Sequence, residues 1–136
     1  MNLYYQIKSG DDFLIKKTKD LIFKNYHKPK HTIAASILTK SGSIYSGINI
    51  RGCATSICAE KVALANAIMA KVDDYESLVV ILYDKEIGYK ILPPCGDCRQ
   101  FLIDYIPDIF VIIENDNRLL KIQAKNLLIN PYISNR

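Results

Sequence analysis

The sequence has 136 residues, enough for one compact domain and too few for two ordinary ones, so we expect a single domain over residues 1–136. Hydrophobic residues make up 49% of the chain and charged residues 24%, proportions typical of a folded domain rather than a disordered one. A membrane-spanning helix needs about 20 apolar residues, and no uncharged stretch, the one over residues 41–50 included, is longer than ten residues. No basic segment followed by an apolar core precedes Asp11 and Asp12, so no secretory signal is visible and we expect a cytoplasmic protein.

The net charge of +4 is spread along the whole chain. The densest cluster of lysines lies within residues 16–30, where it is interpreted as the solvated face of a helix and its exit loop. Basic proteins often bind nucleic acid, but without a clustered basic groove we do not expect a nucleic-acid partner.

The first predicted element is a helix that begins near Ser9. Ser9 and Asp12 have the spacing of a capping box, and apolar residues then recur at helical spacing. Pro29 restricts the residue before it, so we expect this helix to end near His27.

Two strands and a second helix follow. Residues 32–39 and 43–50 are strand-like, and Gly42 lies in the short segment between them, which predicts a hairpin. Residues 58–71 are rich in helix formers, and residues 62–70 carry no charge on any face. A helix that is apolar all round is buried, either inside a domain or against another subunit.

The second half of the chain alternates strands and helices. Residues 77–83 are a continuous apolar run, as expected for a central strand covered on both sides. The further predicted elements are a helix over 95–106, strands over 109–114 and 119–122, and a short helix over 124–129. This alternation, with one hairpin at the front, predicts an α/β layered sandwich with a mixed sheet of about five strands.

The four cysteines are too few and too unevenly placed for a disulfide scaffold in a domain of this size. Cys95 and Cys98 form a C-x-x-C pair at the start of a predicted helix, and Cys58 begins another. We expect the helix N-termini to lower the thiol pKa values and favour thiolates. Three thiolates on Zn²⁺ leave one tetrahedral position open, as in a catalytic zinc site, and Cys53 is then a bystander.

Two groups complete this predicted site. A water in the open position would have its pKa lowered to about 7 by the metal, and Glu60, two residues beyond Cys58, could move its proton as general base and then general acid. Three thiolates outweigh the charge of one Zn²⁺, so a cation should stand nearby. Lys61 and Arg99, which directly follow the ligand motifs, are the candidates for this charge compensation.

Cys58-Ala59-Glu60, followed by the segment Pro94-Cys95-Gly96-Asp97-Cys98-Arg99-Gln100, resembles the cytidine deaminase family in its small three-cysteine branch. The resemblance extends over nearly the whole chain and implies a three-layer α/β/α fold with one zinc per chain. It also implies hydrolytic deamination at carbon 4 of a cytosine nucleoside, as in pyrimidine salvage, with Glu60 protonating ring nitrogen 3 and the departing amine. By the same resemblance, Asn49 contacts the sugar and the backbone N–H of Ala59 holds the carbonyl oxygen of the base. Members of this size are usually homotetramers, which would explain the uncharged helix.

The pattern departs from nucleoside-specific members at three places. They carry Asn-x-Glu where this chain has Asn49-Ile50-Arg51, and a guanidinium donates hydrogen bonds where a carboxylate accepts them. His31 stands at the segment that packs on the base, either as a stacking residue or as a polar residue at a strand start. With its short loop before Cys58, the chain is more similar to blasticidin-S deaminases, so the substrate is either cytidine, deoxycytidine or a cytosine nucleoside antibiotic. Arg51 could reach a carboxylate or phosphate of the substrate, or point to solvent or another subunit.

Two other functions remain open at this point. All four cysteines, with Cys53 and Cys58 separated by four residues, could close a structural zinc site without chemistry. A nucleic-acid deaminase of the same superfamily would flip a base out of its strand, but such enzymes usually have His in place of Cys58.

Overall fold

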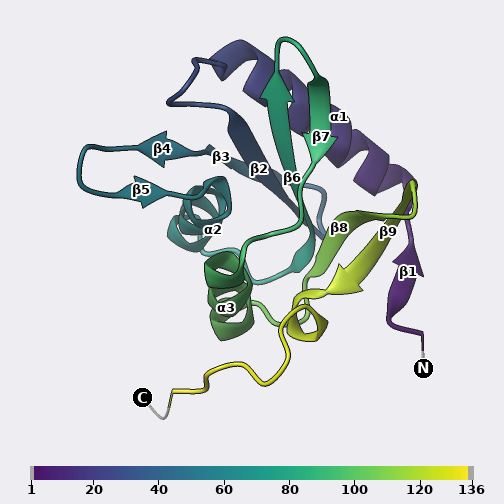
Figure 1. The fold of residues 1–136 in the computed structure, drawn as a ribbon. Coiled ribbons are helices and arrows are strands. Elements are labelled where there is room, and N and C mark those ends of the chain that lie inside the picture. Colours follow the sequence, from purple (N-terminus) through teal and green to yellow (C-terminus); the bar gives the residue numbers. More distant parts are fainter. Residues whose placement is uncertain (1, 135–136) are drawn as a thin grey trace.

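The computed structural model describes residues 2–134 of the chain. The strands of its main sheet are β1 (Tyr4–Gln6), β2 (Ile33–Thr39), β3 (Ile44–Ile48), β6 (Tyr75–Asp84), β7 (Gly88–Ile91), β8 (Phe110–Asn115) and β9 (Arg118–Gln123). Within the described residues, six of these seven strands lie side by side in the order β1–β9–β8–β6–β2–β3, and the seventh, β7, pairs with β6 (Figure 1). β6 and β8 are parallel, whereas the other pairs are antiparallel, so the sheet is mixed as predicted.

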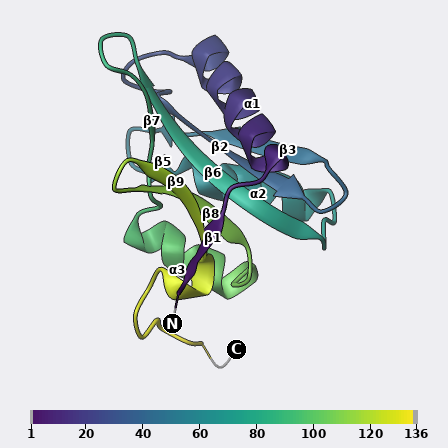
Figure 2. The same ribbon diagram turned by 90° about the vertical axis from the view of Figure 1, so that its right-hand side faces the viewer.

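Helices cover both faces of the sheet. α1 (Ser9–Asn25) packs on one face, and α2 (Ala59–Met69) and α3 (Gly96–Tyr105) pack on the other, as the two views in Figures 1 and 2 show. The predicted three-layer α/β/α sandwich is therefore confirmed. A separate small hairpin of β4 (Ile50–Arg51) and β5 (Ser56–Ile57) projects beside the N-terminus of α2.

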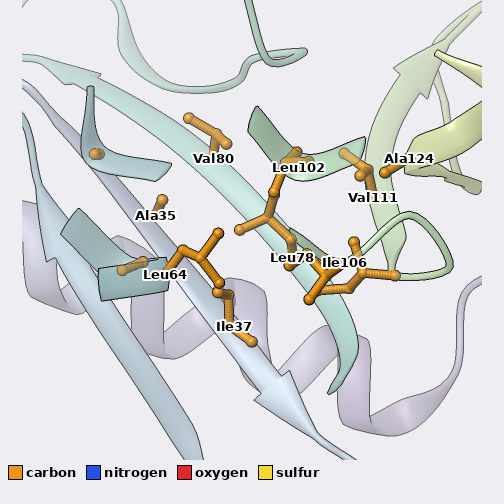
Figure 3. Packing of buried hydrophobic residues seen from close by; sticks show 12 residues of the cluster. Ala35, Ile37, Leu64, Leu78, Val80, Leu102, Ile106, Val111 and Ala124 are labelled. Atoms are coloured by element: carbon orange, nitrogen blue, oxygen red, sulfur yellow. The ribbon is translucent and has the colours of Figure 1, made fainter. Parts of the chain in front are cut away.

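The core lies on both sides of β6 because successive side chains of a strand point to opposite faces. Leu78 and Val80 belong to the cluster under α2 and α3, whereas Val79 and Ile81 belong to the cluster under α1. Figure 3 shows the first of these clusters, in which Leu64 of α2 and Leu102 of α3 pack with residues of β2, β6 and β8. The continuous apolar run in the sequence is thus explained by burial of β6 on both faces.

The sheet is larger than the expected five strands because β1 and β7 add to it. All three residues of β1 are exposed and only the ends of β7 are partly buried, so neither strand shows apolar periodicity. β7 shares one edge of β6 with β8: Ile81–Asp84 of β6 pair with β7, and Ser77 and Leu78 pair with β8. After β7, the chain leaves the edge of β6 at the point between β7 and β8 and continues into the segment that leads to α3.

Helix ends differ from the predictions by a few residues. Lys8, not Ser9, is the N-cap of α1, and its backbone N–H donates to Oδ2 of Asp11 at 2.9 Å, so Asp11 takes the capping position expected of Asp12. The expected helix over 124–129 is shortened to the 3₁₀ turn η1 (Ala124–Asn126). No helix among residues 2–134 is long and apolar enough to cross a membrane.

Asp11 also takes part in a buried ion pair that joins α1 to the sheet. Nζ of Lys121 in β9 lies 2.9 Å from Oδ2 of Asp11, and these side chains are 3% and 2% exposed. Oγ of Ser77 in β6 donates to Oδ1 of the same carboxylate at 2.7 Å. Both carboxylate oxygens are therefore satisfied inside the protein.

α2 packs closely on β3. A Cβ added at Gly47 would lie only 2.6 Å from the backbone nitrogen of Ala63 and from Cβ of Val62, so only glycine allows this approach. Of the uncharged helix residues, Ala63, Leu64 and Ala67 are buried, whereas Ile68 and Met69 are 41% and 81% exposed. The outer face of α2 is therefore apolar but uncovered in the single chain.

Candidate active site

A cavity of about 350 Å³ opens between the β4–β5 hairpin, the N-terminus of α2 and the segment that enters α3. Its lining contains both the cysteine motifs and the candidate base. The lining residues are Ile33, Asn49, Ile50, Arg51, Ser56, Ile57, Cys58, Ala59, Glu60, Val80, Leu92, Pro93 and Cys95.

Three cysteine sulfurs converge at one side of this cavity. Cys58 is the N-cap of α2, Cys95 is the N-cap of α3, and Cys98 lies in the first turn of α3. The Sγ atoms of the three residues all lie within 4.8 Å of one another. In a tetrahedral site with Zn–S bonds of about 2.3 Å the sulfurs are about 3.8 Å apart, a separation compatible with the spacing of these three sulfurs. Three thiolate donors at this spacing fit Zn²⁺ with a fourth position left for a non-protein ligand.

The fourth cysteine lies apart. Among the residues that the structure describes, the group able to hold a metal contains Cys58, Cys95 and Cys98 but not Cys53. Cys53 is exposed at the tip of the β4–β5 hairpin. The closed four-cysteine site considered from the sequence is therefore not formed.

The pKa values of two of the thiols are shifted in the direction opposite to the one expected. Burial, and then the negative charge of Glu60, raises the pKa of the Cys98 thiol far above its usual range. Burial also raises the pKa of Cys58. Loss of hydration and the neighbouring groups thus act against the lowering of the pKa that we expected from the helix N-termini. Only thiolates are ligands, so metal binding here must release protons.

Glu60 is placed in the first turn of α2, next to the sulfurs. Its residue is only 6% exposed, and it lines the cavity. Burial raises the pKa of its carboxyl, although hydrogen bonds and Lys61 act in the opposite direction. A buried carboxyl with a raised pKa beside a metal site has the properties of a group that accepts and returns a proton.

The two candidate cations make different contacts. Lys61 bridges α2 to α3 through an ion pair with Asp97, and its ammonium lies over the ring of Phe101. The pKa of Lys61 is raised by its hydrogen bond to Asp97 and by the negative charges of Asp97, Cys98 and Cys58. Lys61 therefore interacts electrostatically with the cysteine sulfurs.

Arg99 is engaged elsewhere. Its Nε donates to the carbonyl oxygen of Pro94 at 2.7 Å, and Nη1 donates to that of Leu127 at 2.9 Å. Arg99 thus ties the segment before Cys95 to the C-terminal part of the chain. Its role in charge compensation stays a prediction.

Not all of the residues that were predicted to contact the substrate line the cavity. Asn49 lines the cavity, but its Oδ1 accepts hydrogen bonds from the backbone N–H groups of Thr32 and Ile33 at 2.8 and 3.0 Å. Its Nδ2 donates to Oγ1 of Thr32 at 3.4 Å, which leaves one amide hydrogen for a ligand. His31 is not among the lining residues, and its Nδ1 donates to the carbonyl oxygen of Asn49 at 2.8 Å. His31 is therefore placed to hold the Asn49 segment.

The remaining predicted contacts do face the cavity. Ala59 lines it as the first residue of α2, where the backbone N–H has no partner within the helix. Arg51 lines it from β4, opposite Ser56 in β5. Lining residues that were not predicted from the sequence include Ser56, Ile57, Leu92 and Pro93. The adjacent prolines 93 and 94 before Cys95 were a usable signal, because such a segment is stiff and cannot continue a strand ladder.

Comparison with known proteins adds one decisive observation. The family described as "Cytidine and deoxycytidylate deaminase zinc-binding region" matches residues 8–114, which include all three ligand cysteines and Glu60. The chain belongs to the cytidine and deoxycytidylate deaminase family. The protein is therefore a zinc-dependent deaminase, and the cluster of Cys58, Cys95 and Cys98 could hold its metal ion.

Individual relatives agree with this family. Blasticidin-S deaminase of Bacillus cereus is 31% identical over 137 aligned residues, covering 96% of this chain and 98% of that protein. A cytidine deaminase of Sporosarcina psychrophila is 33% identical over 66% of this chain and 63% of that protein. Among solved structures, the cytidine deaminase of Bacillus anthracis superposes with a TM-score of 0.75 at 22% identity, covering 89% of this chain and 88% of that one. This last likeness supports the cytidine deaminase fold.

Proposed function

We propose that this deaminase hydrolyses the amino group at carbon 4 of the cytosine ring of a free nucleoside or a cytosine nucleoside antibiotic. Water adds to carbon 4, the bond to the exocyclic nitrogen breaks, and the products are the uracil compound and ammonia. The observation that carries this proposal is a cavity lined by Cys58, Cys95 and the buried Glu60, with the sulfur of Cys98 within 4.8 Å of the other two sulfurs.

Zinc held by Cys58, Cys95 and Cys98 would supply the Lewis acid that makes a water nucleophilic at neutral pH. Glu60 would carry one proton of that water to ring nitrogen 3, and then carry the second, from the hydroxyl group formed at carbon 4, to the leaving amine. The free N–H of Ala59 would hold the carbonyl oxygen of the base, and Asn49 would donate its remaining amide hydrogen to the sugar. We assign His31 the positioning of Asn49, in agreement with its hydrogen bond to that residue.

The experiment is a substrate comparison on zinc-loaded protein. Cytidine, deoxycytidine and blasticidin S are supplied in parallel, and ammonia release is measured together with loss of cytosine absorbance. Turnover of any of the three supports the proposal, and the pattern identifies the substrate. Absence of ammonia from all three, with one zinc bound per chain, would overturn it.

We further infer that the chain works as a homotetramer. The support is the outer face of α2, which carries no charge and exposes Ile68 and Met69. Ile68→Glu together with Met69→Glu is expected to lower the mass measured by light scattering. The matched control is Ile87→Glu, on the remote turn between β6 and β7, where Ile87 is 70% exposed. A tetramer mass unchanged by the α2 variant, or a monomeric parent protein, would contradict this assembly.

The proposed cellular setting is the cytoplasm, where the reducing conditions keep thiol ligands available. There the uracil nucleoside would enter pyrimidine salvage if cytidine or deoxycytidine is the substrate. Detection of the protein in a fractionated cell extract tests the location.

A further inference from the structure

The guanidinium of Arg51 stands at the cavity without a protein partner. Arg51 lies in β4, is exposed, and lines the cavity together with Ser56, its cross-strand neighbour in β5. Within residues 2–134, no hydrogen bond or ion pair to its side chain is found. Apart from the ligand thiols, Arg51 and Glu60 are the charged side chains of this lining, and Glu60 is committed to the ring chemistry.

Apart from Glu60 and the thiols, the polar side chains of the lining offer mainly hydrogen-bond donors. The Oδ1 atom of Asn49 is already occupied by two backbone N–H groups, so its amide offers a substrate only a hydrogen. A guanidinium likewise only donates. The hydroxyl of Ser56 is the remaining polar side-chain group of the lining. These lining side chains therefore suit a group that accepts hydrogen bonds better than a pair of sugar hydroxyls that need acceptors.

We propose that Arg51 selects substrates in which the cytosine nucleoside carries an anionic oxygen group, a carboxylate or a phosphate, on its sugar. The planar fork of the guanidinium matches either group and can bind it through two parallel hydrogen bonds. The inference rests on the proposed function, because it takes the cytosine ring to lie at Glu60. Arg51 is thus a specificity-determining residue, and neutral cytidine is a poorer substrate.

The test compares three substrates that share the ring: cytidine, cytidine 5′-monophosphate and the 5′-carboxylate analogue of cytidine. Specificity constants are measured for the parent protein, Arg51→Gln and Arg51→Glu. The control is Arg118→Gln, which removes an exposed arginine at the start of β9, outside the cavity lining. In parallel, calorimetry on Glu60→Gln protein, with and without Arg51→Gln, measures binding of uridine and uridine 5′-monophosphate, so that recognition by Arg51 is measured without turnover.

The parent protein is expected to favour at least one anionic substrate over cytidine. Comparison of the 5′-monophosphate with the 5′-carboxylate then shows whether the site prefers phosphate or carboxylate. Loss of a charge-assisted hydrogen-bonded pair should reduce this preference by about tenfold to a hundredfold in Arg51→Gln, and further in Arg51→Glu. Arg118→Gln should retain it. The proposal is overturned if cytidine is used as well as both anions, or if Arg51→Gln leaves the preference unchanged.

The two proposals fail in different ways. Deamination of cytidine with no effect of Arg51 would support the ring chemistry and overturn the anion selection. An Arg51-dependent binding preference without deamination of any substrate would support the anion selection and overturn the ring chemistry.

Discussion

Lys121 and Asp11 form an ion pair in the interior, with Nζ and Oδ2 2.9 Å apart and side-chain exposures of 3% and 2%. The pair connects β9 to the first turn of α1, and Ser77 in β6 completes the hydrogen bonding of the carboxylate. A buried pair contributes little relative to a well-packed apolar pair, but removing one partner leaves an uncompensated charge. The junction of α1 with the sheet therefore depends on both residues being present.

Lys121→Met is expected to reduce the free energy of unfolding by about 3 to 5 kcal/mol, because Asp11 loses its buried counter-ion. Urea unfolding followed by circular dichroism measures this loss. Lys125→Met is the matched control, since Lys125 pairs with Asp108 at 2.8 Å but the two side chains are 50% and 75% exposed. An exposed pair is worth at most about 1 kcal/mol, so equal losses in the two variants would contradict the assigned role of burial.

The same pair predicts how stability depends on pH. Burial raises the pKa of Asp11, but hydrogen bonds from the N–H of Lys8 and from Ser77, with the charge of Lys121, outweigh it and hold the pKa below its usual value. The contribution of Asp11 is therefore complete above the unfolded pKa of about 3.9 and is lost as the pH falls through the lower folded value. Unfolding of the parent protein and of Asp11→Asn should be compared between pH 7 and pH 2.5. The difference in stability should shrink below about pH 4, and a difference independent of pH would count against this assignment.

Glu60→Gln should retain zinc and the fold but lower the turnover number by about a hundredfold to ten-thousandfold, the usual range for loss of a general acid–base group. Ammonia release and metal analysis on the same sample measure both properties. Glu86→Gln, on the exposed turn between β6 and β7, serves as the control. Substantial activity in the Glu60 variant would refute the proton transfer assigned to it.

The zinc content of cysteine variants should distinguish Cys53 from the three cysteines whose sulfurs converge. Cys95→Ser is expected to lose stoichiometric zinc, because one of the three converging sulfurs is removed. Cys53→Ser should bind one zinc per chain and keep its activity, since Cys53 is exposed at the hairpin tip. Loss of zinc from Cys53→Ser would reinstate the closed four-cysteine site.

Gly47→Ala should destabilise the protein by about 1 to 3 kcal/mol, the usual cost of forcing an extra methyl group into a packed contact. The new Cβ would meet the backbone of Ala63, which cannot move without displacing α2. Gly10→Ala provides the comparison, because its nearest contact, Cδ2 of Leu38, is 3.4 Å away and α1 gains a better helix former. Equal stability of Gly47→Ala and the parent would show that α2 can move away from β3.

Much of the architecture was predictable from the sequence. β6 was evident from its continuous apolar run, and α2 from its helix formers next to Cys58; the helix expected over 95–106 corresponds to α3. β1 and β7 were not, since they are short and mostly exposed and their residues carry no apolar alternation. Their pairing depends on the strands beside them rather than on their own composition.

The site was predictable to the extent that local motifs define it. The ligand cysteines and Glu60 lie within short spacings at two helix starts, so their convergence could be inferred. The hydrogen bond of His31 to Asn49 and those of Arg99 to two carbonyl oxygens could not, because each joins segments whose relative position only the fold determines.

Pro93 and Pro94 occupy the point where the chain leaves the edge of β6 between β7 and β8. Neither residue has a backbone N–H, so the segment can depart from the sheet without leaving an unpaired donor. Both also have a fixed φ, which means that the approach to Cys95 has little conformational entropy to lose on folding. The stiffness of the chain at Pro93 and Pro94 therefore restricts where Cys95 can lie, even before side chains pack around it.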